Sequence, residues 1–403
     1  MQLQPPHLEE QLLDLVKNNQ NHFWVGQHPP FDFATANITD SINFRLTPGH
    51  HHRYDVVWCY ELDPATLVGN QYELLFDELL RLIGEEGKLV VRYSQSEHFT
   101  VIRLKHFLGR RYNTEISIES ESQHNGVFTT VFAVKRLNLD QYRRTDWSLA
   151  IITQGTRVEN VVRFLESVRS ADPNFSHEII VCGPENEAYE KYQVRYHSGP
   201  ANGRPYRDKL AEISRKKNDL AEIATGANLL IIHDRYVLDE GFFDGFDRYG
   251  YDFDFLAVLQ QYECGSHFPA YVGMIGPELT WQVPLVCEDY NQIHPNQFLN
   301  GGFLIAKTET LRAVRFNDML LWNQAEDMEL SYTFRLHSLP PRMNCFSRAT
   351  TLGITPEYTK TFVPFPKAPS KAIISFKNIL KDSGRKIERR LRPYLRKLKK
   401  RSA

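Results

Sequence analysis

Hydrophobic positions in the first 145 residues alternate between continuous apolar runs, typical of buried strands, and the three-to-four-residue spacing of helices. Runs at 54–60 and 88–93 predict strands, and leucines at helical spacing predict a helix at 72–83. The other elements expected here are a glycine-containing break at 84–87, a helix at 98–108, and alternating strands at 114–119 and 127–135. This order predicts an α/β sheet with an antiparallel edge.

A second α/β pattern follows a polar linker at 138–147. Strands alternate with helices of 10–15 residues, which predicts a parallel, doubly wound sheet. The expected elements are strands at 148–154, 178–182, 228–232 and 300–306, and helices at 158–168, at 208–224 and from 326 onward. The predicted fold class is therefore α/β, with two doubly wound domains at 1–145 and 146–365 and a basic, amphipathic helical tail at 366–403.

Charge is distributed unevenly along the chain. Residues 371–401 contain 13 Lys and Arg but only two acidic residues, which leaves 35 basic and 47 acidic residues elsewhere. Apolar residues recur in this tail at spacings of three, four or seven, so one helical face is apolar and the other basic. This pattern predicts binding to an anionic membrane surface. Nucleic acid is not expected as a partner because phosphate contacts do not require an apolar face, and a solvated tail is the remaining alternative.

Cysteine content and hydropathy suggest the cellular compartment. The five cysteines are widely spaced and form no CxxC pair, which argues against a disulfide framework or a zinc ribbon. No apolar run reaches the length of a membrane span. The expectation is a cytoplasmic protein that is peripheral at the inner face of the cell membrane.

The segments "YDVVWCYELDP", "LLRLIGEEGKLVVRY" and "GVFTTVFAVKR" resemble the second half of a class I S-adenosylmethionine-dependent methyltransferase. The resemblance covers roughly residues 50–136. The glycine-rich cofactor loop of that family has no counterpart before Tyr54, and neither Gly26 nor Gly49 belongs to GxGxxG. The domain is therefore interpreted as a truncated, inactive remnant, with active methyl transfer as the alternative.

Ionisable residues gather at two points of the second pattern. The apolar run 228–232 ends in His233-Asp234-Arg235, and Glu326-Asp327 stand where a later helix begins. A strand that delivers a carboxylate to its carboxyl end places that charge at the edge of an open α/β sheet, where ligands bind.

The segments "LAIITQGTR", "EIIVCGPE", "ISRKKNDLAEIATGANLLIIHDRY", "NGGFLIAKTETL" and "AEDMELSYTFRLHS" together resemble an inverting, GT-A-fold glycosyltransferase of family 2 type over residues 148–353. The resemblance implies transfer of a sugar from a nucleoside-diphosphate sugar, with Asp327 of the Glu326-Asp327 pair as the catalytic base. The implied donor-binding residues are Thr153, Gln154, Lys217, Asn218, His233, Asp234 and Arg235. The implied acceptor-binding residues are Asn300, Gly301 and Gly302, and His337 is a further candidate for acceptor or metal contact.

The family's metal motif is altered in this chain. His233 replaces the first motif position and Arg235 the last, where a carboxylate is expected. Asp234 and His233 remain candidate ligands for Mn²⁺ or Mg²⁺. Alternatively, Arg235 neutralises the leaving diphosphate and no metal is needed.

The predicted function is glycosyl transfer to a hydroxyl of a growing cell-surface polysaccharide or a lipid-linked glycan. Two alternatives stay open at this point. One is methyl transfer by the first domain, alone or beside glycosylation. The other is a non-catalytic scaffold for polysaccharide assembly, which the missing motif carboxylate would favour.

Overall fold

The computed structural model describes residues 8–174, 176–198, 211–276, 279 and 295–359. Met1–Pro356 forms one compact unit and Glu357–Ala403 a second. The predicted basic tail lies outside the described residues. Within the described chain no helix is long and apolar enough to span a bilayer.

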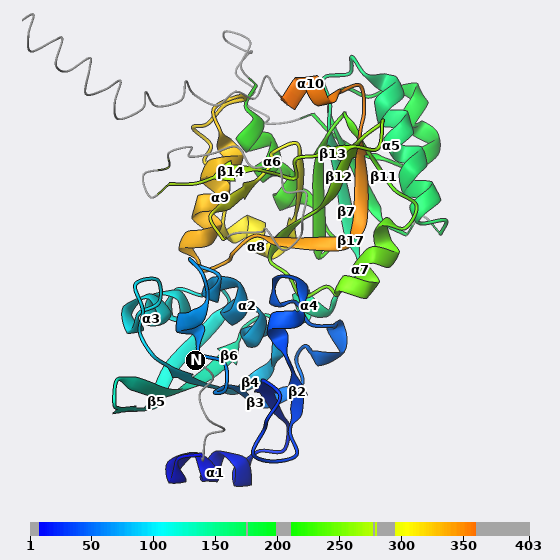
Figure 1. The fold of residues 1–403 in the computed structure, drawn as a ribbon. Coiled ribbons are helices and arrows are strands. Elements are labelled where there is room, and N and C mark those ends of the chain that lie inside the picture. The colour runs from blue at the N-terminus through cyan, green and yellow to red at the C-terminus, as the bar shows by residue number, and fades with distance from the viewer. Residues whose placement is uncertain (1–7, 175, 199–210, 277–278, 280–294, 360–403) are drawn as a thin grey trace, which may run out of the picture. The chain divides into compact units, whose positions relative to one another are not determined.

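The N-terminal region, residues 8–143, is built on a six-stranded sheet in the order β2-β1-β3-β4-β6-β5 (Figure 1). β1, β2, β3 and β4 pair in parallel, while β6 pairs antiparallel with both β4 and β5, so the predicted antiparallel edge is present. The strands are β1 (His22–Val25), β2 (Ala34–Ala36), β3 (Tyr54–Cys59), β4 (Ile83–Tyr93), β5 (Thr114–His124) and β6 (Val127–Arg136). The helices are α1 (Glu10–Asn18), α2 (Tyr72–Leu82), α3 (Val101–Gly109) and α4 (Asp140–Arg143), with short 3-10 turns at Ile38–Asp40, Ile42–Phe44, Pro48–His50 and Pro64–Thr66.

The helix α2 ends at Leu82, before the predicted break at 84–87, but that segment belongs to β4, whose register with β3 shifts between the pairs Tyr54–Ile83 and Val56–Lys88. Close packing of β3 explains the glycine in this strand. A Cβ atom on Gly87 would lie 2.6 Å from the carbonyl oxygen of Asp55. The glycine therefore permits close approach of two strands and does not mark a turn.

The C-terminal region, residues 147–356, contains a second, larger sheet with the main path β11-β17-β12-β16-β10-β7-β8-β9, with β13 paired to β12. Its strands are β7 (Trp147–Ile152), β8 (Glu178–Cys182), β9 (Arg195–His197), β10 (Asn228–His233), β11 (Tyr236–Leu238), β12 (Phe255–Tyr262), β13 (His267–Phe268), β16 (Phe303–Lys307) and β17 (Arg342–Thr351). β14 (Tyr271–Met274) and β15 (Gln297–Leu299) form a separate pair. The helices are α5 (Val158–Ala171), α6 (Ile213–Ile223), α7 (Phe242–Tyr249), α8 (Thr308–Ala313) and α9 (Glu326–Leu336), with a 3-10 turn at Glu187–Tyr192; α10 (Pro356–Thr359) ends the described chain.

Strand direction in this second sheet differs from the prediction. β10, β7, β8 and β9 are parallel as expected, but β16 pairs antiparallel with both β10 and β12. The sheet is therefore mixed. The antiparallel strand follows the Gly301-Gly302 turn and brings that turn to the end of β10, where the candidate site lies.

Apolar packing joins the two regions. One cluster of buried side chains includes Leu75 and Leu79 of α2 together with Leu330 and Phe334 of α9. Helices from the two halves of the sequence thus contribute to one continuous core, although each half has its own sheet.

Candidate functional site

The candidate site lies where β10 ends, beside the start of α9. β10 is a central strand whose first five residues are buried, and it pairs with β7 on one side and β16 on the other. The peptide N–H of His233 donates to the carbonyl of Gly302 at 3.0 Å. This bond joins the strand end to the glycine turn, so the sheet itself fixes the separation of these two candidate elements.

Asp234 is buried, and both of its carboxylate oxygens are occupied. Thr153 donates its hydroxyl to Oδ2 at 2.8 Å, and Arg157 forms a 2.8 Å ion pair with Oδ1. The Asn160 side chain also donates to the Asp234 carbonyl at 3.0 Å. Thr153, which follows β7, therefore contacts Asp234, and the negative charge of Asp234 is balanced by Arg157, which was not among the residues predicted from the sequence.

His233 faces a different set of groups. Burial, together with the nearby Lys217 ammonium, lowers the pKa of its imidazole to about 4, so the ring is neutral at pH 7. Its Nε2 atom is buried and has no hydrogen-bond partner among the described residues. The ring lies close enough to Glu326 for that carboxylate to favour its protonated form.

His233 and Asp234 do not fit a shared metal ion in this structure. Asp234 is engaged by Thr153 and Arg157, whereas His233 is grouped with Lys217 and Glu326. No cluster of three His, Cys, Asp or Glu side chains able to hold a metal occurs in the described part of the chain. A divalent ion at this motif would need oxygen ligands that Arg157 and Thr153 already occupy.

The Gly301-Gly302 turn connects β15 to β16 and contacts α9 closely. Gly301 donates its N–H to Oδ2 of Asp327 at 2.8 Å, and its carbonyl accepts from Lys217 at 2.7 Å. A Cβ atom on Gly301 would lie 2.9 Å from both Cβ of Asp327 and Oε1 of Glu326. Only a residue without a side chain allows this approach.

Lys217 and Glu326 form an ion pair of 3.1 Å in which the Lys217 side chain is completely buried. Burial alone would raise the pKa of Glu326, but the Lys217 ammonium outweighs it and lowers that pKa below its ordinary value. The charge of Lys217 is thus already compensated inside the protein. Lys217 supports the start of α9 through its contacts with Gly301 and Glu326.

Asp327 stands in the first turn of α9 and is partly buried. Burial, together with repulsion from Glu326, raises the pKa of its carboxyl to about 6, against the opposing effects of Lys217 and of the Gly301 and Met328 N–H groups. Ala325, which precedes the helix, has a φ of +60°. A non-glycine residue in this conformation costs on the order of 1–3 kcal/mol and is typical of functional sites.

Two predicted ligand residues are used internally. Asn218 donates to the Phe316 carbonyl at 2.9 Å and to Asp318 at 2.7 Å, while accepting from the Phe316 N–H at 3.0 Å. Asn300 donates to Gln260 at 2.8 Å and accepts from the Gly302 N–H at 2.8 Å. The side-chain amides of Asn218 and Asn300 are therefore hydrogen-bonded to neighbouring loops of the protein itself.

Gln154 and Arg235 lie at strand ends near Asp234, whereas His337 lies at the C-terminal end of α9. Gln154 is exposed beyond β7, and Arg235 is partly exposed beside Asp234; neither side chain forms a hydrogen bond or ion pair with another described residue. Both remain accessible at the strand ends. His337 caps the C-terminal end of α9, ten residues after Asp327, which corresponds to roughly 15 Å along a helix. His337 therefore lies at the opposite end of α9 from Asp327.

The loop before α9 presents two apolar side chains to solvent, Met319 at 85% and Trp322 at 52% exposure. The loop is held in place by Asn218 and by Ser214, which donates to the Leu320 carbonyl at 2.8 Å. Exposed apolar side chains on a fixed loop beside an ionisable pair suggest a ligand contact. Met319 and Trp322 could not be recognised from the sequence, because a single Trp in a polar loop has no distinctive pattern.

The turn after β1 in the N-terminal region is filled by the chain itself. Glu61 accepts hydrogen bonds from the peptide N–H groups of Gln27 and His28, both at 3.0 Å, and from the Trp24 indole at 2.9 Å. Its other oxygen contacts the His28 ring at 2.9 Å. These backbone donors, which could otherwise receive a ligand at the sheet edge, are already used. We therefore do not propose methyl transfer for this region.

Comparisons with known proteins give matches in fold alone. No family model matches the chain, and no curated protein is similar in sequence. A crystal structure of GalNAc-T7 with UDP, GalNAc and Mn²⁺ matches at a TM-score of 0.39 and 14% identity, over 52% of this chain and 44% of that one. S. aureus TarS 1-349 matches at a TM-score of 0.32 and 15% identity, over 51% of this chain and 60% of that one. The chain thus spans about half the length of these two glycosyltransferases.

Proposed function

We propose that the C-terminal region is an inverting glycosyltransferase in which Asp327 is the general base. The observation that carries the proposal is the environment of this carboxylate. It lies at a helix start held against a glycine turn, with its pKa raised to about 6 by burial and by Glu326. Such a group is mostly ionised at pH 7 and is still basic enough to accept a hydroxyl proton.

The proposed step is a single displacement. The acceptor oxygen forms a bond to the anomeric carbon while its proton passes to Asp327. The bond between that carbon and the diphosphate oxygen breaks on the opposite face, and the nucleoside diphosphate leaves with the electron pair. The configuration of the sugar is inverted because attack and departure occur on opposite faces.

The donor is proposed to bind at the ends of β7 and β10. In this proposal Thr153 and Gln154 contact the nucleotide. Arg157 and Arg235 supply positive charge beside Asp234, and the Arg157 side chain keeps 43% exposure. Stabilisation of the leaving diphosphate by fixed charges is often the largest contribution to catalysis. The mechanism therefore includes no step through a metal ion.

The acceptor is proposed to approach from the loop before α9. Trp322 lies five residues before Asp327 and offers an aromatic face to a sugar ring. Gly301 and Gly302 form the backbone turn beside the base, and Gly301 donates its N–H to Asp327. The acceptor class that we propose is a growing surface polysaccharide or lipid-linked glycan. Residues 371–401 would hold the protein, as a cytoplasmic and peripheral enzyme, at an anionic membrane.

Nucleotide binding provides the direct test. Purified full-length protein is titrated with UDP, GDP, CDP and dTDP, each in EDTA and in Mn²⁺, and thermal unfolding is recorded. A nucleotide at ~100 times its Kd stabilises the folded state by about 2.7 kcal/mol. Selective stabilisation by one nucleotide supports the proposal and identifies the donor class. No stabilisation by any of the four contradicts it and favours a non-catalytic scaffold.

A further inference from the structure

The C-terminal end of α9 is held by the N-terminal region. Arg335, in the last turn of α9, forms a two-pronged ion pair with Glu73 in the first turn of α2, with Nε–Oε2 at 3.3 Å and Nη2–Oε1 at 3.2 Å. Both side chains are largely shielded from solvent. This geometry fixes the orientation of the two partners as well as their separation.

Two more bonds hold the chain just beyond α9. The peptide N–H of Tyr112 donates to the His337 carbonyl at 3.1 Å, and Arg111 donates to the Ser338 carbonyl at 2.6 Å. Ser338 has a φ of +56°, so the backbone reverses direction at this point. A positive side chain beside the carbonyl end of a helix also complements the helix dipole.

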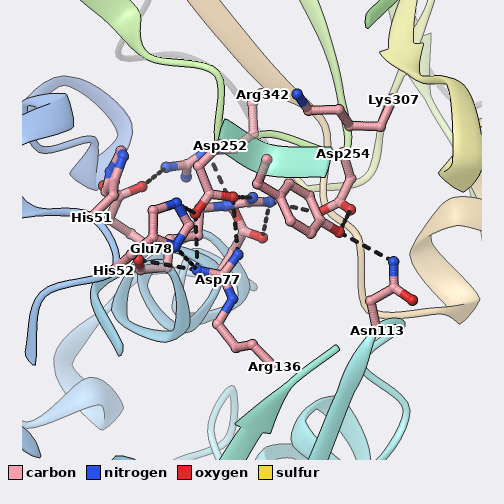
Figure 2. A network of polar contacts seen from close by, with 12 residues as sticks. His51, His52, Asp77, Glu78, Asn113, Arg136, Asp252, Asp254, Lys307 and Arg342 are labelled. Atoms are coloured by element: carbon pink, nitrogen blue, oxygen red, sulfur yellow. Dashed lines mark hydrogen bonds and ion pairs between the residues drawn. The ribbon is translucent and has the colours of Figure 1, made fainter. Parts of the chain in front are cut away.

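Arg111 is itself part of a buried network of ion pairs between the two regions. It pairs with Asp77 of α2 at 2.7 Å and with Asp254, which precedes β12, at 3.0 Å. Figure 2 shows the network continuing through Asp252, Arg136, Glu78 and Arg342. Removing one member of a buried ion pair leaves its partner as an uncompensated buried charge, so such an anchor resists local movement.

α9 also packs along its length against the shared core. Leu330 and Phe334 are buried, and the Phe334 ring stacks on Phe255 with centroids 4.1 Å apart. The helix contains 11 residues and is therefore about 16 Å long. A helix of this length, packed at its middle, moves as a rod, so a shift at the Arg335 end tilts the Asp327 end.

We infer that the N-terminal region positions Asp327 by holding the opposite end of α9, with Glu73 and Arg111 as positioning residues. The inference rests on the proposed function for the role of Asp327. It gives the N-terminal region a part in the reaction that requires no cofactor or substrate of its own. If Glu73 had a purely structural role, its substitution would change the free energy of unfolding and leave kcat unchanged.

The test uses full-length Glu73→Gln, Arg335→Gln and the double variant. The matched control is Glu119→Gln, which removes an ion pair with Lys88 between β4 and β5 of the same region. Amide hydrogen exchange is followed in peptides covering 326–331, and kcat and KM are measured as release of the nucleoside diphosphate from sugar donors of the nucleotide that the titration selects. We expect faster exchange at the start of α9 and a kcat lowered roughly tenfold or more, since small misplacements of a catalytic group are costly. The donor KM should stay within about twofold because the donor residues lie on other elements.

The double variant and the control complete the design. The double variant should match either single variant, because both remove the same interaction. Arg335→Lys, which keeps a positive charge, should recover part of the lost kcat, and Glu119→Gln should behave like the wild type.

Unchanged exchange at 326–331 in Glu73→Gln overturns the inference, even if the variant is less stable. Unchanged kcat in an active enzyme also overturns it. Altered exchange in a protein that binds no nucleotide would instead count against the proposed function and leave the mechanical coupling in place.

Discussion

The peptide N–H of Gly301 donates a 2.8 Å hydrogen bond to Oδ2 of Asp327. This bond joins the turn before β16 to the start of α9. Because the Gly301 carbonyl also accepts from Lys217, which pairs with Glu326, the backbone of one residue helps to order both carboxylates of the Glu326-Asp327 pair. The base is thus oriented by backbone before any substrate arrives.

Asp327→Asn should abolish most of the activity while leaving nucleotide binding intact. The amide keeps the size of the side chain but cannot accept the acceptor proton. A general base contributes about 10²- to 10⁴-fold to the rate, and kcat should fall within this range. Steady-state kinetics and nucleotide titration of the same preparation measure the two effects. Retained activity in this variant would remove Asp327 from the mechanism.

The pH profile should show an acidic limb near pH 6, because Asp327 must be ionised to act and burial with Glu326 raises its pKa to about 6. Glu326→Gln removes the repelling charge while Lys217 stays nearby. The pKa of Asp327 should therefore fall, and the limb should move to lower pH. Measuring kcat/KM from pH 4.5 to 8 for both proteins checks this. A limb that stays in place or moves upward would contradict the assignment.

Arg157→Gln should weaken nucleotide binding roughly tenfold, because hydrogen bonds to charged groups contribute about 1.5–3 kcal/mol. EDTA should leave the wild-type affinity unchanged within about twofold. The control is Arg163→Gln on the same helix, whose side chain pairs with Glu263 at the surface. Calorimetric titration measures all three affinities. Loss of wild-type binding in EDTA would restore the metal-dependent alternative.

Gly301→Ala should lower both stability and kcat. The new methyl group would lie 2.9 Å from two atoms of the Glu326-Asp327 pair, so the start of α9 must shift. Overpacking of this kind typically costs 1–3 kcal/mol. Gly241→Ala is the control because no atom lies within 4 Å of its added Cβ. Urea unfolding and kinetics of both variants provide the comparison, and equal behaviour of the two would show that the turn tolerates a side chain.

Acidification should destabilise the protein through His52 as well as through the carboxylates. Burial lowers the pKa of His52 from 6.5 to about 3, although Asp252 acts in the opposite direction. The unfolded state therefore binds more protons between pH 6.5 and 3, and the free energy of unfolding falls as pH drops through that window. Urea unfolding at several pH values measures the slope. His52→Asn should flatten it, and an unchanged slope would show that His52 does not contribute.

The sequence was sufficient to locate the elements of the candidate site, because each depends on local signals. The apolar run at 228–232 became β10, extended only to His233, and α9 begins at Glu326 as expected. Direction was not predictable for β16, since its apolar run reads the same in either orientation. Only the pairing with β10 and β12 shows that it is antiparallel.

Partners of individual side chains were harder to predict than elements. Lys217 and Asn218 have the residue types that bind a diphosphate, yet Lys217 pairs with Glu326 and Asn218 holds Phe316 and Asp318. These partners lie about a hundred residues away in the chain, and periodicity carries no information at that range. Arg157 was missed for the opposite reason. At the start of a helix it looks like an ordinary solvated side chain, and only the fold places it on Asp234.

Glu61, as part of the chain itself, competes with any free anion for the N–H groups of Gln27 and His28. Because the carboxylate is tethered to the chain, it meets the N–H groups of Gln27 and His28 at an effective concentration that covalent connection can raise to the millimolar range or above. A free anion or cofactor at cellular levels would have to displace it at every encounter. The turn after β1 is therefore held closed by a carboxylate of the same chain.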